Sequence, residues 1–505
     1  MNRRWFVATT AAGLAAAAGY WGWQKWFAKS PTQKDPDELA QQMAQRPLTP
    51  PPPPTKRLLG WNVNWVEQSR QGRDSGKLMA LLQQLGSNVT RDSHEWAWVQ
   101  RGKDSPFTKD RYVKAAEDVI RSQYSAASLE SLRLLCYGND SYWTGEKYPT
   151  PAQFARFANG FAAYATHIMD DQPATRWLEV WNEWNLSNRF NGDEAIRRGP
   201  LYAQLFVHAA DAIHRKRPDA IVITQGLAIS KEANGLPDNE FLVRTLNHPG
   251  VLQSADGIGL HPYFFKLQGS PERLMNYLAF TRQQLMREVK GYKERPLPFY
   301  ITETGFPTAE KSSLAIGSRW GYGIDEPLQA AFLARLAILC MSQPHVHGLV
   351  FHNLVDSGKD KGNIEHNFGL LHHDLSPKLA WQRMSALVPV LLRATDFEWI
   401  LGTSAEVQSV KDALNATASP IYAVRFRSDP ERWCTAVWST LDKSTSVRIK
   451  ATDGGLMEIC DKQYGLSPRT IRHSSSEAFD LQLDSEPVYI TQVGPAAPTR
   501  LQISA

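Results

Sequence analysis

Short apolar runs alternate with longer stretches of helical periodicity over most of the chain from Leu58 onward. The runs have the length of buried strands, and the stretches between them repeat their apolar residues as a helix covering a sheet does. Eight such cycles predict eight parallel strands. We expect these strands at Leu58–Trp65, Asn88–Asp92, Leu132–Gly138, Trp177–Glu183, Ile221–Leu227, Gly257–Tyr263, Phe299–Glu303 and Gly348–Asn353.

A helix is expected after each strand. Several of these helices begin with a proline that follows a polar residue, as at Thr150-Pro151 and Ser376-Pro377, which is a common helix start. The expected helices are Ser75–Leu85, Lys109–Ser122, Pro151–Met169, Leu201–Lys216, Asn239–Leu246, Pro271–Val289, Pro327–Met341 and Pro377–Leu392. The repeats predict an α/β fold, a (β/α)8 TIM barrel over residues 58–394. An open doubly wound sheet is the alternative, but no Gly-rich phosphate-binding pattern follows the first strand.

The pattern changes after Leu392 to short segments of alternating apolar and polar residues, such as Ile421–Arg427 and Trp433–Trp438. Residues 395–505 are therefore expected to form a C-terminal antiparallel β-sandwich. Cys434 and Cys460 lie in this region and could pair in an oxidising compartment.

The N-terminal segment, residues 1–29, places Arg3 and Arg4 before an uncharged, Ala-rich run. This arrangement is similar to a twin-arginine export signal, and the run is also long enough to remain as a membrane anchor. Residues 30–57, which include Pro50 to Pro54, predict a Pro-rich linker. We expect an exported bacterial protein, periplasmic or held at the inner membrane facing the periplasm.

The composition is that of a large globular protein, with 505 residues, 42% of them hydrophobic and 21% charged. The net charge of +5 arises from 56 Lys and Arg against 51 Asp and Glu spread along the chain. Such a balance gives no electrostatic reason to expect a nucleic-acid partner.

Two predicted strands end in a glutamate: WLEVWNEWN contains Glu183 and FYITETG contains Glu303. The carboxyl ends of all barrel strands meet on one face, so both carboxylates are expected there. A lone glutamate is more often a salt-bridge residue. A pair placed in this way is what a retaining glycoside hydrolase uses as acid/base and nucleophile.

Most of the other predicted strands also end in side chains that hydrogen-bond hydroxyl groups. The candidate substrate-binding residues are Asn182, Arg91, His94, Trp96, Asn139, Trp184, His261, Tyr263, His352 and Asn353. His94, His261 and His352 could instead bind zinc, but no metal-binding spacing relates them. No metal and no cofactor are expected.

The motifs WNEWN and ITETG resemble those of the retaining clan-A glycoside hydrolases, most of all glycoside hydrolase family 39 and related bacterial exopolysaccharide hydrolases. The resemblance extends over about Leu58 to Thr491. It implies that Glu183 is the acid/base, Asn182 the partner of the sugar 2-hydroxyl and Glu303 the nucleophile.

The same resemblance implies that the Tyr263 hydroxyl touches the nucleophile and that Arg91 keeps the nucleophile ionised. One residue departs from the pattern, because the clan usually presents a tryptophan at the end of strand eight and this chain has His352.

The expected function is the retaining hydrolysis of β-glycosidic bonds in an oligo- or polysaccharide, such as a bacterial exopolysaccharide or another envelope or plant-type glycan. Two alternatives remain at this stage. One is a non-catalytic polysaccharide-binding or scaffold protein of the envelope, and the other is a metal-dependent hydrolase.

Overall fold

The structure is a computed structural model. It describes residues 35–51, 56–103, 105–143, 149–186, 199–229, 238–263, 270–309, 323–402, 409, 412–413, 419–441, 443–451, 455–466, 468–473, 478–493 and 501–504. The predicted signal or anchor at residues 1–29 lies outside these ranges. Within them, no helix has the length and apolar character that crossing a membrane requires.

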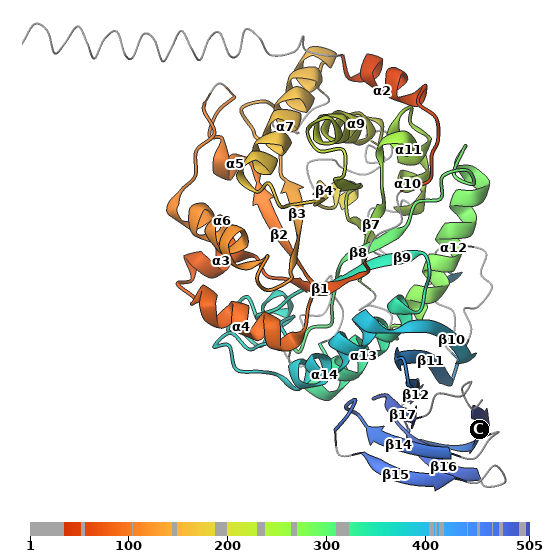
Figure 1. The fold of residues 1–505 in the computed structure, drawn as a ribbon. Coiled ribbons are helices and arrows are strands. Elements are labelled where there is room, and N and C mark those ends of the chain that lie inside the picture. Colours follow the sequence, from red (N-terminus) through yellow and green to blue (C-terminus); the bar gives the residue numbers. More distant parts are fainter. Residues whose placement is uncertain are drawn as a thin grey trace, which may run out of the picture.

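Nine parallel strands curl around a common axis (Figure 1). They are β1 (Leu58–Asn62), β2 (Val89–Glu95), β3 (Glu130–Cys136), β4 (Trp177–Val180), β5 (Ile221–Ile223), β6 (Leu227–Ile229), β7 (Ile258–Pro262), β8 (Phe299–Thr304) and β9 (Val346–Phe351). Their order is β5-β4-β3-β2-β1-β9-β8-β7-β6.

The two ends of this sheet meet at the fifth predicted strand, which is interrupted at residues 224–226 and so forms both β5 and β6. Single bridges join Asn182 to Gly226 and Ile223 to Gly257, which connects this position to its neighbours on both sides. The sheet is therefore closed, and the predicted eight-stranded barrel is confirmed.

Helices surround the barrel. The long ones are α4 (Ser75–Leu85), α6 (Arg111–Gln123), α7 (Pro151–Asp171), α9 (Gly199–Lys216), α10 (Asp238–Asn247), α12 (Arg273–Glu288), α13 (Glu326–Met341) and α14 (Leu379–Arg393). Short helices α3 (Trp65–Arg70), α5 (Trp96–Val99) and α11 (Val251–Ser254) lie between them. The start of α7 shows why the chain becomes helical there. Thr150 accepts from the backbone N–H of Gln153, and the side chain of Gln153 accepts from that of Thr150, with Pro151 in the first turn.

The barrel interior is apolar where the strands begin. A buried cluster fills this end and consists of Leu58, Val89, Leu132, Trp177, Ile221, Ile223, Tyr300 and Val350. Within it, the rings of Trp177 and Tyr300 pack edge to face with centroids 5.8 Å apart. This plug excludes water from below, so polar groups in the interior are confined to the end where the strands finish.

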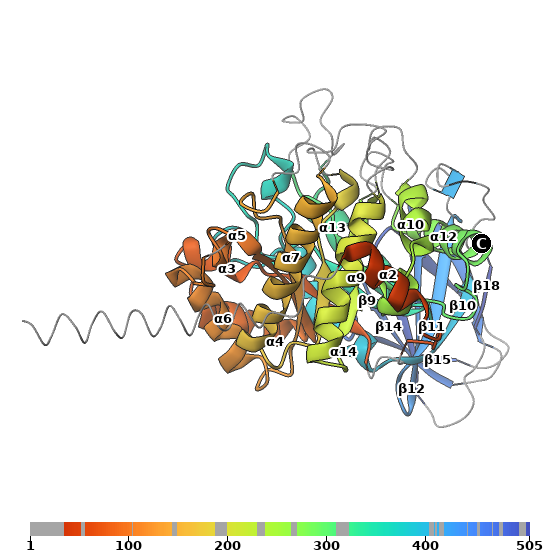
Figure 2. The same ribbon diagram turned by 90° about the horizontal axis from the view of Figure 1, so that it is seen from above.

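Part of the predicted linker is folded. Helix α2 (Pro36–Ala44) buries Leu39, Ala40 and Met43 and packs against α9 and α11 (Figures 1 and 2). The apolar residues recur at helical spacing, and the side chain of Asp35 accepts two backbone N–H groups of the first turn. Residues 36–44 of the predicted linker are therefore a helix that packs on the outer layer of barrel helices.

The C-terminal region contains two antiparallel sheets. The larger has six strands in the order β10 (Thr395–Leu401), β11 (Ile421–Asp429), β12 (Arg432–Ser439), β17 (Val488–Val493), β14 (Gly455–Asp461) and β15 (Arg469–His473). The smaller has β16 (Ala478–Leu483), β13 (Thr445–Ala451) and β18 (Leu501–Ser504). One apolar cluster draws residues from both sheets, including Val437 and Ile449. The predicted sandwich is confirmed.

The disulfide considered for Cys434 and Cys460 is not formed, and both thiols are free and buried. Cys434 lies on β12 and Cys460 on β14, with β17 between these strands. Two strand spacings amount to about 10 Å, which exceeds the Cα separation of about 7 Å that a disulfide can span.

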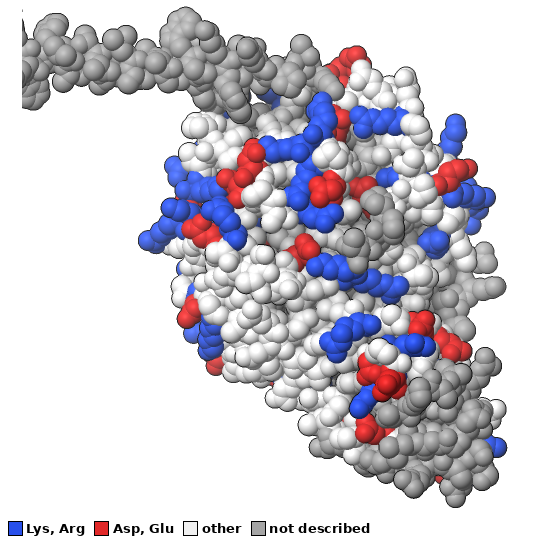
Figure 3. All heavy atoms as spheres, viewed as in Figure 1, with Lys and Arg blue, Asp and Glu red and all other residues white. Residues whose placement is uncertain are grey.

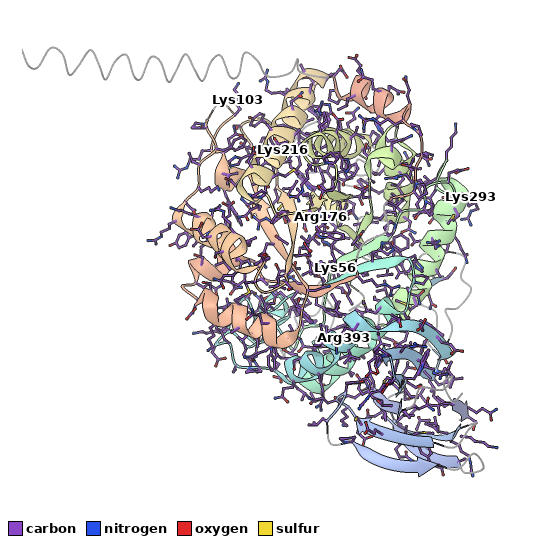
Figure 4. The ribbon with its side chains drawn as sticks, viewed as in Figure 1. Lys56, Lys103, Arg176, Lys216, Lys293 and Arg393 are labelled. Atoms are coloured by element: carbon purple, nitrogen blue, oxygen red, sulfur yellow. The ribbon has the colours of Figure 1, made fainter. Side chains whose placement is uncertain are left out.

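Cations and anions are mixed on the face shown in Figures 3 and 4. The labelled Lys56 lies two residues before β1 and Arg176 one residue before β4, so this is the end of the barrel where the strands begin (Figure 4). Lys56 pairs with Glu130 at 2.8 Å and Arg176 with Asp219 at 3.2 Å. This face is not uniformly positive.

The sandwich is joined to the barrel by a buried ion pair. Glu272, at the start of α12, accepts from Nε of Arg335 at 2.7 Å and from the indole N–H of Trp438 at 2.8 Å. Arg335 lies on α13 and Trp438 on β12, and all three side chains are at most 2% exposed. The carboxylate thus connects two barrel helices to a sandwich strand.

Replacing Glu272 by Gln is expected to lower the free energy of unfolding by about 3–5 kcal/mol, because the Arg335 charge would remain buried without its anion. Urea unfolding followed by tryptophan fluorescence measures this change. Glu240→Gln is the matched control, since Glu240 makes an exposed pair with Arg244 at 2.7 Å, for which less than about 1 kcal/mol is expected. If both substitutions lowered the free energy of unfolding by the same small amount, the buried Glu272–Arg335 pair would not have the stabilising role assigned to it.

Candidate active site

Arg91 is the centre of a polar cluster at the end of the barrel where the strands finish. It points inward from β2 and is only 3% exposed. Its Nε donates to Glu179 at 2.6 Å, its Nη1 to Glu303 at 2.8 Å and its Nη2 to Asn182 at 3.0 Å. One guanidinium therefore orients Glu179 on β4, Asn182 just after β4 and Glu303 on β8.

Glu303 lies on β8 with both carboxylate oxygens engaged. Arg91 donates to Oε2, and the Tyr263 hydroxyl donates to Oε1 at 2.6 Å. Burial alone would raise the pKa of Glu303, but nearby positive charge, that of His261 first and that of Arg91 among the others, lowers it to about 2. Glu303 is consequently a carboxylate at neutral pH.

Glu183 follows β4 and faces Glu303. Its Oε1 lies 2.8 Å from Nδ1 of His261, and its side chain is 20% exposed. One oxygen of each glutamate and a ring nitrogen of His261 all lie within 4.8 Å of one another. Retaining glycosidases place their two carboxyl groups about 5–5.5 Å apart and inverting enzymes about 6.5–9.5 Å, so this spacing fits the retaining arrangement.

The backbone at Glu183 is held in an unusual conformation, with φ of 46°. Its N–H donates to the carbonyl of Gly226 at 3.2 Å, next to the bridge between Asn182 and Gly226. A left-handed non-glycine residue costs on the order of 1 kcal/mol and persists where its surroundings hold it. Here the interrupted fifth strand supplies the support that turns Glu183 toward Glu303.

His261, on β7, is fully buried between carboxylates. Its Nε2 lies 3.1 Å from the Thr302 hydroxyl and 3.6 Å from an oxygen of Glu179. Burial acts to lower the pKa of His261, yet the negative charge of Glu303 and the bonds to Glu179 and Glu183 raise it to about 9. A pKa of about 9 favours the imidazolium at neutral pH, against the opposing charge of Arg91, whose Nη2 lies 3.3 Å from Nε2.

Two residues of this cluster, Glu179 and Thr302, were not among the predicted site residues. Glu179 is fully buried and also accepts from the Thr302 hydroxyl at 2.6 Å. The sequence does contain a sign of the role of Glu179. It is a charged residue inside the apolar run WLEV, on a strand that is buried on both faces, and such a residue requires a charged partner. Thr302 and Glu303 are consecutive yet both bond inside the barrel, where the pairing of β8 with β9 shifts register.

His94 does not reach the site, so its predicted role is wrong. Strand β2 continues to Glu95, beyond the predicted end, and His94 is three residues after the inward-facing Arg91. Alternation then points it outward, where Nε2 lies 2.9 Å from Glu117 on α6. Burial lowers the pKa of His94 to about 4.

Trp96, Asn139 and Trp184 also pack away from the two glutamates. Trp96 is fully buried and donates through its indole N–H to Gln100, and Asn139 donates to the backbone carbonyl of Gln100. Trp184 is 1% exposed and packs on Trp181 with centroids 4.6 Å apart. These residues support the loops after the strands, and no side-chain surface remains for a ligand.

Asn182, His261, Tyr263 and His352 lie around the glutamates as predicted, whereas Asn353 is only 6% exposed. The backbone carbonyl of Asn353 accepts from Leu370. Beside the site, Tyr137 is 44% exposed, and the charges of both glutamates add to burial in raising its pKa.

The three histidines considered as zinc ligands are not brought together, since His94 is bonded to Glu117. Among the described residues, the set close enough to hold an ion is Glu183, His261 and Glu303. The pKa of about 9 for His261 means that a metal ion would have to displace a proton there. The donor set is thus better suited to proton and sugar chemistry than to a cation.

No protein-family model and no curated protein sequence matches this chain. Its structure is similar to that of a family 39 glycoside hydrolase from Bacteroides cellulosilyticus WH2, with a TM-score of 0.62, 20% identity and coverage of 90% of this chain and 82% of that chain.

Two further similar structures come from other bacteria. For a monomeric β-xylosidase from Caulobacter crescentus CB15 the TM-score is 0.55 at 14% identity, covering 90% of this chain and 99% of that one. For a GH39 enzyme from Xanthomonas axonopodis pv. citri the TM-score is 0.54 at 16% identity, and the match covers 88% of this chain and 96% of that one. The expected resemblance is confirmed at the level of the fold.

Replacing Glu303 by Gln is expected to lower the pKa of His261 from about 9 toward the ordinary 6.5, because the carboxylate charge that stabilises the imidazolium is removed. In the wild type, the contribution of protonated His261 to the stability of the folded state is fully present below pH 6.5 and is lost as the pH rises through about 9. NMR titration of the imidazole measures the shift. Glu240→Gln should leave it unchanged, and an unaltered His261 in Glu303→Gln would refute the assigned coupling.

Proposed function

We propose that the protein is a retaining glycoside hydrolase that cleaves β-glycosidic bonds, with Glu303 as nucleophile and Glu183 as acid/base. The observation that carries this proposal is the pair of glutamates on the face where the barrel strands finish, with one carboxyl oxygen of each within 4.8 Å of the other. One of the pair is held as an anion by Arg91 and Tyr263, and the other meets an imidazole.

In the first step an oxygen of Glu303 attacks the anomeric carbon of the bound sugar. The bond from that carbon to the leaving group breaks as Glu183 passes a proton to the departing oxygen. A glycosyl ester on Glu303 and an anionic Glu183 result. Arg91 and Tyr263 keep the attacking carboxylate ionised and fix its direction before the reaction.

In the second step Glu183 takes a proton from water, which attacks the anomeric carbon and breaks the ester to Glu303. The sugar leaves with retained configuration, and Glu303 regains its charge. Because the ester carries no charge, Glu183 becomes anionic beside a neutral partner rather than beside a carboxylate. Nδ1 of His261 lies 2.8 Å away, where it can donate a hydrogen bond to that anion.

The proposed substrate is a β-linked oligo- or polysaccharide of the cell envelope or of plant type, such as a bacterial exopolysaccharide. The residues at the N-terminus support this setting, since Arg3 and Arg4 precede an Ala-rich uncharged run. We further propose that the chain is exported and works in the periplasm, free or attached to the inner membrane.

A non-catalytic polysaccharide-binding protein is the second candidate, because the same barrel face could hold a glycan. The low pKa of Glu303 and its two donors favour catalysis, since binding alone does not need an ionised carboxylate held within reach of a second one.

Glu303→Gln and Glu183→Gln are each expected to lower kcat/KM on aryl β-glycosides by at least about a thousandfold, because each removes one half of the double displacement. Initial-rate assays with panels of aryl β-glycosides and exopolysaccharide measure this loss, and proton NMR of the first product should show the β-anomer. Glu240→Gln is the control, and chelator should leave the wild-type rate unchanged. If the wild type binds glycans but does not cleave them, the second candidate, a non-catalytic polysaccharide-binding protein, would be favoured over the hydrolase.

Replacement of Arg3 and Arg4 by Lys is expected to keep the protein in the cytoplasm, because twin-arginine export depends on both guanidinium groups. Cell fractionation with immunodetection of the chain measures its location. The paired control replaces Lys25 and Lys29 by Arg, which preserves charge outside the twin-arginine motif. Undiminished export of the Arg3 and Arg4 variant would rule out this route.

A further inference from the structure

The carboxylate of Glu303 has two chemically different sides. Its Oε2 meets the guanidinium of Arg91 at 2.8 Å, and Arg91 also holds Asn182. Its Oε1 meets the phenol of Tyr263 at 2.6 Å, and Nδ1 of His352 lies 4.0 Å from the same oxygen. A permanent cation therefore stands on one side, and a phenol and an imidazole stand on the other.

This asymmetry orients a sugar ring whose anomeric carbon sits over Glu303. The anomeric carbon has two ring neighbours, C2 with its hydroxyl and the ring oxygen. Positive charge develops on the ring oxygen in the oxocarbenium-like transition state, so a guanidinium beside it would be repulsive. The 2-hydroxyl is therefore expected on the side of Arg91 and Asn182. The ring oxygen, C5 and the C5 substituent then lie on the side of Tyr263 and His352.

The side chain of His352 is only partly covered at this place, although Nδ1 is not its exposed atom. Its Nδ1 is buried without a hydrogen-bond partner among the described residues, while the side chain as a whole is 19% exposed. The ring packs against Phe368 with centroids 5.2 Å apart, which fixes its plane. Part of the imidazole therefore remains accessible beside the glutamates.

The protonation of His352 follows from its surroundings. Burial lowers its pKa, and the cations Arg91 and His261 act in the same direction, while Glu303 and Glu183 act against it. Because Oε1 of Glu303 lies 4.0 Å from Nδ1 and its charge attracts an N–H, we assign the single proton of the neutral imidazole to Nδ1. Its Nε2 then has a free lone pair, which is an acceptor that the indole of a tryptophan lacks.

We propose that His352 contacts the substrate and selects the sugar, with Nε2 accepting a hydrogen bond from a hydroxyl on C6. The site would then take β-hexopyranosides in preference to pentopyranosides or 6-deoxy sugars. This inference rests on the proposed function, because it uses the position of the anomeric carbon over Glu303.

The test compares aryl β-hexopyranosides of the gluco, galacto and manno series with their 6-deoxy analogues. The wild type should prefer the hexoside by about tenfold in kcat/KM, the effect of one neutral hydrogen bond. His352→Phe keeps the ring shape and should lower kcat/KM on the hexoside alone, so that the preference falls to about one. His352→Gln retains an acceptor and should keep part of the preference. His373→Phe is the control and should leave it unchanged, because the charged neighbours of His373 are Arg73, Lys359, Asp356 and Asp374 and neither glutamate of the site.

Equal loss on both substrates in His352→Phe would overturn the proposal, since it would show a general structural role. An unchanged preference in that variant, or no preference in the wild type, would overturn it as well. If His352→Phe does not fold, His352→Leu provides the same comparison. If the wild type cleaves no glycoside, the proposed function fails. Calorimetric binding of methyl β-hexopyranosides and their 6-deoxy counterparts then decides the inference, which fails if the wild type does not distinguish them.

Discussion

The buried charge of Arg91 is the constraint on which the rest of the active face depends. A guanidinium that is 3% exposed persists only if anions and acceptors surround it, because an uncompensated buried charge costs several kcal/mol. Glu179 and Glu303 both pair with it, at 2.6 and 2.8 Å. Glu179 is fully buried and neutralises part of the charge of Arg91 and His261, and these two cations in turn lower the pKa of Glu303. The pairing partner that the sequence analysis missed therefore allows both cations to lie beside Glu303.

The remaining architecture protects this arrangement. The apolar plug below, with Trp177 and Tyr300, removes water from the inner end of the barrel and so strengthens the interactions above it. The interrupted fifth strand turns Glu183 into place through Gly226. The Glu272 carboxylate ties the sandwich to the helix that follows β7, the strand carrying His261. Of these three features only the contact of Gly226 touches a candidate catalytic residue, since its carbonyl accepts from the N–H of Glu183.

The errors of the sequence-based prediction have a common cause. His94 and Trp96 were placed at the site because they follow a predicted strand end, but β2 extends through Glu95 and alternation turns His94 outward. A shift of a few residues in a strand boundary is enough to move a side chain to the opposite face. Whether Cys434 and Cys460 pair was a question that the sequence left open, and the strand order answers it, because β17 lies between the two strands that carry them.

The sequence by itself determined the repeat of strands and helices, the change to a sandwich and the positions of Glu183 and Glu303 at strand ends, because these depend on local periodicity and residue type. The tertiary structure alone decided which polar groups meet. Arg91, Glu179 and Glu303 are separated by 88 and 124 positions along the chain and converge only because the barrel closes. The charge state of Glu303 and the accessible edge of His352 follow from that convergence, since burial and neighbouring charge are properties of the folded interior.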